Sequence, residues 1–220
     1  MKSMNNELDV TNITKNTYDQ IATGYSDKID NLVSDSWVGK YEQQLLDEFL
    51  RMIDTSNPDI LDIGCGNGKD TAYLMKKGAL VDSVDYSPNM LEEARKRVQN
   101  GRFHQMDMRK LKFPDEEFDG VWANGCIYHV PKSEINLVIS EIIRVLKPSG
   151  ILSFNAKEGI GERLEINPKS YGGGSRFYAY YNIKEMTKIL EKSGFRIIKT
   201  ENYPEEIFNE KIFHIWVHKS

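Results

Sequence analysis

The chain has 220 residues, enough for one well-cored domain and few for two. Its composition is ordinary for a globular protein, and a net charge of -4 gives no overall positive field that would favour nucleic acid or an anionic membrane. Two cysteines, Cys65 and Cys126, make no disulfide framework and fit a reducing cytosol. No apolar run approaches the ~20 residues of a membrane span, and residues 1–9 lack the apolar region of a signal peptide. We therefore expect a soluble, cytoplasmic protein.

The N-terminal quarter of the chain predicts two helices. A helical pattern runs from about residue 14 to 29 and places Tyr18 and Tyr25 along one side. A second helix, over about 36–52, carries aromatic and aliphatic side chains at a spacing of three to four residues, which is typical of core packing.

From residue 58 onward, strand and helix patterns alternate. Alternating β and α elements indicate a parallel sheet that is covered on both faces. Right-handed crossovers place the C-terminal ends of such strands along one edge, where ligands bind. We expect strands near 59–64, 79–85, 101–106, 117–124 and 150–156, and helices near 69–77, 88–100 and 133–146.

The first of these strands ends in three glycines at alternate positions, Gly64, Gly66 and Gly68. Glycine allows positive φ and lets a ligand approach the main chain closely. Because a helix follows, the loop offers free backbone N–H groups and a helix N-terminus. This arrangement suits a nucleoside-type ligand.

The next strand ends in Asp85, about 17 residues beyond Gly68, near the interval at which nucleotide-binding units place a carboxylate on ribose hydroxyls. Two vicinal hydroxyls can each donate to one carboxylate oxygen, so we interpret Asp85 as a ribose ligand. The alternative is a turn aspartate that caps the helix beginning near residues 87–88.

The pattern changes after residue 154. Residues 157–175 are rich in glycine and are predicted to form a long loop, followed by an extended segment over 176–181. A helix over about 183–193 and strands near 195–203 and 211–218 close the chain. Arg176, Tyr178 and Tyr180 share one face of the extended segment. That face suits an anionic or aromatic acceptor, or a half-buried strand with its polar side in water.

Five blocks of sequence resemble the class I S-adenosylmethionine-dependent methyltransferases and follow the order of that family. The resemblance implies one Rossmann-like α/β domain: a doubly wound, seven-stranded sheet with a C-terminal antiparallel hairpin and an N-terminal helical cap. The expected parts are the cap (1–55), the cofactor-binding core (56–156), a substrate-side loop (157–182) and a C-terminal helix with the hairpin (183–220). The blocks are Leu61–Gly68, Val84–Leu91, Phe103–Met108, Phe118–Asn124 and Arg144–Gly150.

The resemblance also implies S-adenosyl-L-methionine as the cofactor and S-adenosyl-L-homocysteine as the product. In the family, the position of Asp62 organises the amino group of the methionine moiety; that of Asp107 accepts from the adenine amine. Met108 would offer a backbone N–H, and Tyr86 and Met90 would flank the purine. The expected cofactor residues are Tyr18, Tyr25, Asp62, Gly64, Cys65, Gly66, Gly68, Asp85, Tyr86, Met90, Asp107, Met108, Asn124 and Gly125.

Methyl transfer from a sulfonium needs alignment and exclusion of water, and it needs a base only when the acceptor arrives protonated. His129 is the candidate base, because its ordinary pKa near 6.5 lets it accept a proton at neutral pH; the alternative is a residue of the pocket wall. No spacing of His, Cys and Asp suggests a metal site. The expected acceptor residues are Tyr128, His129, Arg176, Tyr178 and Tyr180.

These observations predict a methyltransferase that acts on a nitrogen or oxygen atom of a small molecule, as a monomer or homodimer with no membrane partner. One alternative keeps the chemistry: a tRNA methyltransferase that esterifies carboxymethyl-uridine at the wobble position, which the acidic balance weakens. The other is an NAD-binding oxidoreductase. Against it stand the Gly-x-Gly-x-Gly spacing, the acid near the end of the first strand and the acid after the third.

Overall fold

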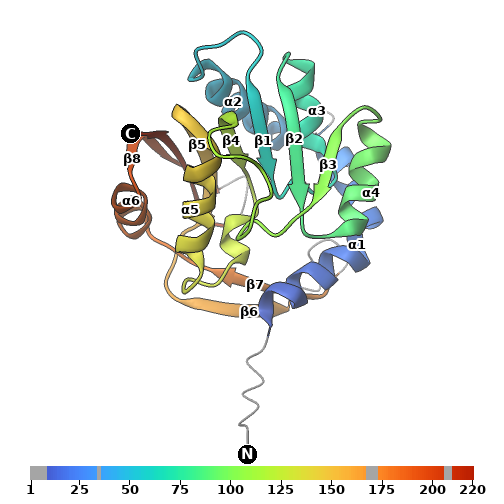
Figure 1. Cartoon of the computed structure of the whole chain (residues 1–220). Helices are drawn as coiled ribbons and strands as arrows, with labels where there is room; N and C mark the ends of the chain where they lie inside the picture. Colours follow the sequence, from blue (N-terminus) through green and yellow to red (C-terminus); the bar gives the residue numbers. More distant parts are fainter. Residues whose placement is uncertain (1–8, 34–35, 167–172, 206–209) are drawn as a thin grey trace, which may run out of the picture.

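The computed structural model describes residues 9–33, 36–166, 173–205 and 210–220 (Figure 1). The helices are α1 (Val10–Val33), α2 (Trp37–Arg51), α3 (Lys69–Lys76), α4 (Pro88–Arg97), α5 (Ile135–Val145) and α6 (Ile183–Lys192), with a 3-10 turn η1 (Ile127–His129). The strands are β1 (Asp59–Ile63), β2 (Leu80–Asp85), β3 (Arg102–Gln105), β4 (Phe118–Ala123), β5 (Leu146–Lys157), β6 (Glu162–Ile166), β7 (Ser175–Ala179), β8 (Phe195–Asn202) and β9 (Ile212–Lys219).

Seven of the strands form one sheet, in the order β3-β2-β1-β4-β5-β9-β8. The first five run parallel, and β9 lies antiparallel between β5 and β8. This topology confirms the expected Rossmann-like sheet with its C-terminal antiparallel hairpin. The strand order reverses between β1 and β4, and in such sheets ligands bind outside the carboxyl ends of the strands at that point.

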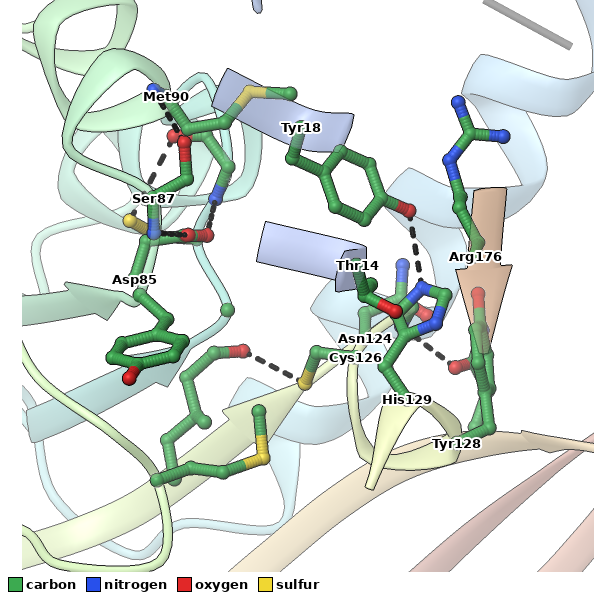
Figure 2. A pocket seen from close by; sticks show the side chains of 18 of the residues that line it. Thr14, Tyr18, Asp85, Ser87, Met90, Asn124, Cys126, Tyr128, His129 and Arg176 are labelled. Atoms are coloured by element: carbon green, nitrogen blue, oxygen red, sulfur yellow. Dashed lines mark hydrogen bonds between the residues drawn. The ribbon is translucent and has the colours of Figure 1, made fainter. Parts of the chain in front are cut away.

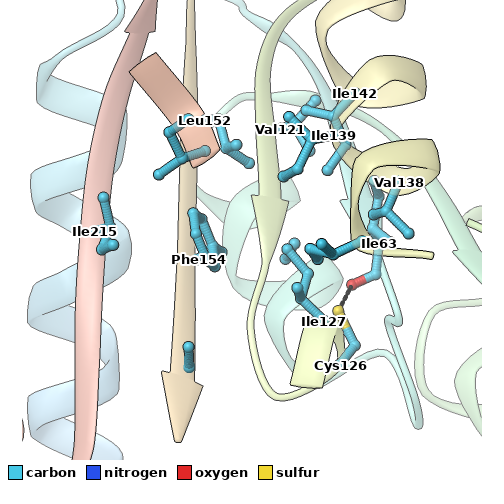
Figure 3. Close-up of a cluster of buried hydrophobic side chains, with 14 of the residues drawn as sticks. Ile63, Val121, Cys126, Ile127, Val138, Ile139, Ile142, Leu152, Phe154 and Ile215 are labelled. Atoms are coloured by element: carbon cyan, nitrogen blue, oxygen red, sulfur yellow. Dashed lines mark hydrogen bonds between the residues drawn. The ribbon is translucent and has the colours of Figure 1, made fainter. Parts of the chain in front are cut away.

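Hydrophobic side chains alternate between the two faces of the sheet. On one face Ile63 of β1 packs with residues of α5 (Figure 3). Leu61 and residues of α6 belong to the same cluster. On the other face Ile60 and Trp122 pack with residues of α2 and α3. Since successive side chains of a strand point to opposite faces, strands buried on both sides read as continuous apolar runs. The two cores fix the strands whose ends form the site.

The predicted long loop over 157–175 is wrong in part, because it contains a strand. Strand β6 pairs with β7 in a separate two-stranded antiparallel sheet, with Glu162 opposite Ala179 and Ile166 opposite Ser175. Most side chains of β6 are exposed, so the sequence carries no alternation of buried and exposed residues that would reveal the strand. The run of glycines that suggested a loop lies partly in 167–172, outside the described residues.

Helix α1 and the β6–β7 sheet lie beyond the arrowheads of the parallel strands (Figure 1). The helix is longer at both ends than the sequence pattern predicts. It packs against β7 on one side and α4 on the other. These two additions therefore cover the edge of the sheet at which the parallel strands end.

Candidate active site

A cavity of about 530 Å³ lies at this covered edge, within the range of small-molecule and cofactor sites. Sixteen of the residues predicted from sequence line it together, although they come from α1, the ends of four strands and the segments that follow them, α4, η1 and β7. Asp62, Gly68 and Tyr180 do not. The sixteen are Tyr18, Tyr25, Gly64, Cys65, Gly66, Asp85, Tyr86, Met90, Asp107, Met108, Asn124, Gly125, Tyr128, His129, Arg176 and Tyr178.

The glycine loop has positive φ at Gly64, Gly66 and Gly68. A side chain at Gly64 would bring its Cβ within 2.3 Å of the Cβ of Cys126, and one at Gly68 within 3.0 Å of the Cβ of Ala94. A Cβ at Gly66 would meet nothing within 4 Å. The first and third glycines therefore allow close packing within the protein, whereas the backbone of Gly66 faces open space in the cavity.

Asp85 connects the glycine loop to the start of α4. Its carboxylate accepts hydrogen bonds from the backbone N–H of Gly66 at 2.9 Å and of Ser87 at 2.8 Å (Figure 2). Burial raises the pKa of this carboxyl group. A carboxylate offers about four lone-pair sites, so these backbone contacts leave some capacity to accept from a ligand. The side chain that caps α4 is Ser87, which accepts from the N–H of Met90.

Asp107 also lines the cavity, in an ion pair with Arg109 that the sequence did not suggest. The guanidinium donates to both carboxylate oxygens, with Nε 2.9 Å from Oδ1. Although burial acts to raise it, the hydrogen bonds from Arg109 hold the pKa of Asp107 below its usual value. Arg109 also pairs with Glu134. Asp107 is therefore an ionised, oriented acceptor.

Asp62 lies behind the glycine loop and outside the cavity wall. It is 2% exposed, and its carboxylate accepts a 2.6 Å hydrogen bond from the hydroxyl of Thr71, which also contacts Ser83. Burial, with a smaller contribution from Asp70, raises the pKa of Asp62 to about 7. Its contact with a ligand stays a prediction, while its contact with α3 is observed.

Tyr180 follows β7 on the extended segment and does not line the cavity. Its hydroxyl donates to Glu165 at 2.6 Å, and the guanidinium of Arg163 lies 4.1 Å from the centre of its ring. The pattern of the segment correctly grouped Arg176 with Tyr178. It could not show that Tyr180 lies against β6, because that strand was not predicted.

His129 lies between α1 and β7, with both ring nitrogens engaged. Nε2 is 3.0 Å from the hydroxyl of Tyr18 (Figure 2), and Nδ1 is 2.7 Å from the carbonyl oxygen of Phe177. Burial lowers the pKa of His129 to about 3, and the positive charges of Lys157 and Arg176 act in the same direction. The ring is therefore neutral at physiological pH.

Hydrogen bonds fix α1 across the cavity. At one end Thr14 accepts from the N–H of Phe177 at 2.9 Å, and Thr17 donates to the carbonyl oxygen of Ser175 at 2.7 Å. Further along the helix, Asp19 accepts from the hydroxyl of Ser87 at 2.6 Å. The helix thus bridges β7 and the loop after β2, and it screens the cavity from solvent.

Several cavity residues were missed by the sequence reasoning. Lys69 and Asp70 directly follow the third glycine, and this position could have indicated them; Lys69 pairs with Glu42 of α2 and with Asp70. Asn155 lies near the end of the fifth parallel strand, β5, and that position could also have indicated it. Tyr203 gives no local signal, because its proximity to the cavity depends on the antiparallel hairpin. Asn155 accepts from the N–H of Gly125 at 2.7 Å and donates to the hydroxyl of Tyr203 at 3.3 Å.

Two features are absent from the described residues. Among them no group of three or more His, Cys, Asp or Glu side chains is arranged to hold a metal ion. In the same part of the chain, no helix combines the length and the apolar character that crossing a membrane requires.

Comparison with known proteins identifies a methyltransferase domain within the chain. Residues 60–150 match the family model of a methyltransferase domain. Trans-aconitate 2-methyltransferase of Enterobacter sp. (strain 638) is 37% identical over 110 residues, which are 49% of this chain and 42% of that protein. Phosphoethanolamine N-methyltransferase 2 of Caenorhabditis elegans is 32% identical over 166 residues, 71% of this chain and 37% of that protein. The chain thus spans less than half the length of these relatives.

Solved structures agree in fold. The [4+2]-cyclase SpnF superimposes with a TM-score of 0.73 at 18% identity, over 96% of each chain. The 1,6-didemethyltoxoflavin-N1-methyltransferase of Burkholderia thailandensis gives 0.63 at 21% identity, over 91% of this chain and 89% of that one. Such identities show the fold alone. Together with the family match over residues 60–150, the topology supports a class I S-adenosylmethionine-dependent methyltransferase.

Proposed function

We propose that this protein transfers the methyl group of S-adenosyl-L-methionine to a nitrogen or oxygen atom of a small molecule. The observation that carries the proposal is the convergence of Asp85, Gly66 and Asp107 on one cavity. An adenosine requires three such groups. Asp85 offers a carboxylate for the ribose, Gly66 offers open backbone, and Asp107 offers a carboxylate for the exocyclic amine.

The residues present fit the cofactor. The open space beside Gly66 gives the cofactor access to the main chain, and the remaining lone-pair capacity of Asp85 can accept from the ribose hydroxyls. Asp107 and the backbone of Met108 would hold the adenine edge, with Tyr86 and Met90 against its faces. Asp62 would act from behind the loop on the amino group of the methionine moiety.

When bound, S-adenosylmethionine supplies a methyl group on a sulfonium: a lone pair of the acceptor forms the bond to the methyl carbon, and the carbon–sulfur bond breaks with its electrons on sulfur. The chain's own residues orient the acceptor and exclude water, and α1 is the element that screens the cavity. Burial raises the pKa of the Cys65 and Cys126 thiols, so both stay protonated and neither is a nucleophile.

A small acceptor is supported by the cover that α1 and β7 form over the cavity. Two of the relatives are named for small molecules, trans-aconitate and phosphoethanolamine. In both cases the name describes that protein and adds support here, without identifying the acceptor of this chain.

The test is transfer of a labelled methyl group from S-adenosylmethionine to a panel of small amines, phenols and carboxylic acids, with bulk tRNA as a separate arm. We expect labelled product in at least one small-molecule arm and none with tRNA. Asp85→Ala should abolish the label at low cofactor concentration. Label in the tRNA arm alone would favour the wobble-uridine alternative and contradict the proposal.

A further inference from the structure

Resting on the proposed function, we propose that the methyl acceptor carries an anionic group, a carboxylate or a phosphate, and that this group binds beside Arg176 and Lys157. These two cations belong to the acceptor wall, which we define as Tyr18, Tyr128, His129, Lys157, Arg176 and Tyr178. All six residues line the cavity.

Arg176 is the central residue of this wall. It lies on β7 and is 2% exposed. Its guanidinium lies 5.2 Å from the centre of the Tyr18 ring, and Nη2 donates to the carbonyl oxygen of Gly173 at 3.4 Å. Figure 2 shows its side chain on the same side of the pocket as His129 and Tyr128. A planar guanidinium fixed in this way suits bidentate binding of a carboxylate or phosphate.

Lys157 approaches the same region from the end of β5. It is 7% exposed, and its ammonium lies 4.1 Å from the centre of the Tyr178 ring and 5.7 Å from that of Tyr128. It also pairs at 2.6 Å with Glu210, whose side chain is half exposed. Lys157 is therefore partly neutralised, and we assign it the smaller share of the anion binding.

Both cations affect the same neutral ring. The positive charges of Lys157 and Arg176 act together with burial to lower the pKa of His129. The ring of His129 lies 4.9 Å from that of Tyr178, which Lys157 contacts, and 5.5 Å from that of Tyr18, which Arg176 contacts. The two cations therefore share one part of the cavity. The aromatic rings around them keep water away, and charge interactions are stronger in such surroundings than in water.

Two carboxylates of the cavity lie apart from the two cations of the acceptor wall. The carboxylates of Asp85 and Asp107 lie at the ends of β2 and β3, on the side assigned to adenosine. Arg176 and Lys157 come from β7 and β5, on the other side of η1. An anionic acceptor would be attracted to the second region and repelled from the first. Its anion would then fix the orientation of the nucleophile, which is the main contribution expected of a methyltransferase site.

The experiment is calorimetric titration of two anionic probes, inorganic phosphate and malonate, into the full-length protein saturated with S-adenosylhomocysteine at constant ionic strength. The variants are Arg176→Met and Lys157→Met. The matched control is Arg163→Met: this arginine lies on the paired strand β6, against Tyr180 and outside the cavity.

We expect the wild-type complex to bind at least one probe, Arg176→Met to weaken that binding about tenfold or more, and Lys157→Met to weaken it less. Arg163→Met should bind as the wild type does. The probe that binds more tightly distinguishes a phosphate from a carboxylate. If Arg176→Met does not fold, Arg176→Lys replaces it, and loss of bidentate geometry should still weaken binding.

No binding of either probe to the wild-type complex, or equal weakening by Arg163→Met, would overturn the inference. Affinity for S-adenosylhomocysteine is measured separately in every variant. If that ligand binds and the anions do not, only the anionic acceptor is wrong. If that ligand itself does not bind, the proposed function fails.

Discussion

The hydroxyl of Tyr18 lies 3.0 Å from Nε2 of His129, and the opposite nitrogen of that ring lies 2.7 Å from the carbonyl oxygen of Phe177. A carbonyl oxygen only accepts, so Nδ1 carries the proton. Nε2 of the neutral ring then accepts from Tyr18. The first helix is thereby connected through one imidazole to β7.

Tyr18→Phe tests this connection. The variant removes one buried hydrogen bond, and we expect the free energy of unfolding to fall by about 1 kcal/mol. Because α1 covers the cavity, we also expect S-adenosylhomocysteine to dissociate faster, as measured by stopped-flow displacement. Tyr73→Phe is the matched control, since its hydroxyl donates to Asp47 outside the cavity. Tyr73→Phe should lower stability to a similar extent. If S-adenosylhomocysteine dissociated equally faster from both variants, the role of α1 in retaining the ligand would be refuted.

His129 remains a predicted base, and the geometry now defines how to test it. Nε2 is occupied by Tyr18, and burial lowers the pKa of the ring to about 3. If His129 orients α1 and the acceptor, His129→Gln should reduce turnover without changing the shape of its pH profile. If it is the base, the profile should lose an ionisation and turnover should fall far more than cofactor affinity.

The three glycines of the loop should respond differently to alanine. Gly64→Ala places a Cβ 2.3 Å from Cys126, and we expect a loss of more than about 2 kcal/mol in unfolding free energy. Gly66→Ala meets no protein atom within 4 Å and should cost only about 1–2 kcal/mol for its positive φ, yet weaken cofactor binding. Urea unfolding and ligand titration measure the two effects. If both variants lost similar stability and Gly66→Ala kept its affinity for the cofactor, the assignment of the open space beside Gly66 to the cofactor would be contradicted.

Acid should destabilise the protein through its buried histidines. Burial lowers the pKa of both His129 and His214 to about 3. This value lies below the pKa near 6.5 of a histidine in the unfolded chain. Below pH 6.5 the unfolded chain therefore binds protons that the folded protein does not, and the free energy of unfolding decreases as the pH falls toward 3. Between pH 6.5 and 4 the loss is up to about 3 kcal/mol for each histidine.

Chemical unfolding between pH 7 and 4 measures this loss. His214→Gln should flatten the dependence of unfolding free energy on pH, because one buried titrating ring is removed. Ser153→Ala removes the 2.7 Å contact of Ser153 with His214 but keeps the ring, so it should preserve the slope. An unchanged slope in His214→Gln would show that other groups govern acid unfolding.

The sequence predicted the parallel core closely, because its signals are local. Apolar runs mark strands buried on both faces, and Gly64, Asp85 and Asp107 stand at their ends, so a general rule of sheet topology brings them together. The pairing of Asp107 with Arg109 could not be predicted, since a spacing of two residues outside regular structure does not fix side-chain direction.

The less predictable part of the site depends on contacts between distant segments. Strand β6 exists through its pairing with β7, and Tyr203 reaches the cavity through the antiparallel hairpin. The position of Lys157 beside two tyrosine rings follows from the packing of η1 against both β5 and β7. Such relationships have no periodic signature in the sequence.

The most direct test of the central claim is calorimetric titration of S-adenosylhomocysteine into the wild-type protein and into Asp85→Ala, with NAD titrated in parallel. We predict one site per chain in the wild type, an affinity reduced by roughly 1–3 kcal/mol in the variant, and no NAD binding. Binding of NAD without S-adenosylhomocysteine, or equal affinity of S-adenosylhomocysteine for wild type and variant, would contradict the assignment of Asp85 and this cavity to the methyl donor.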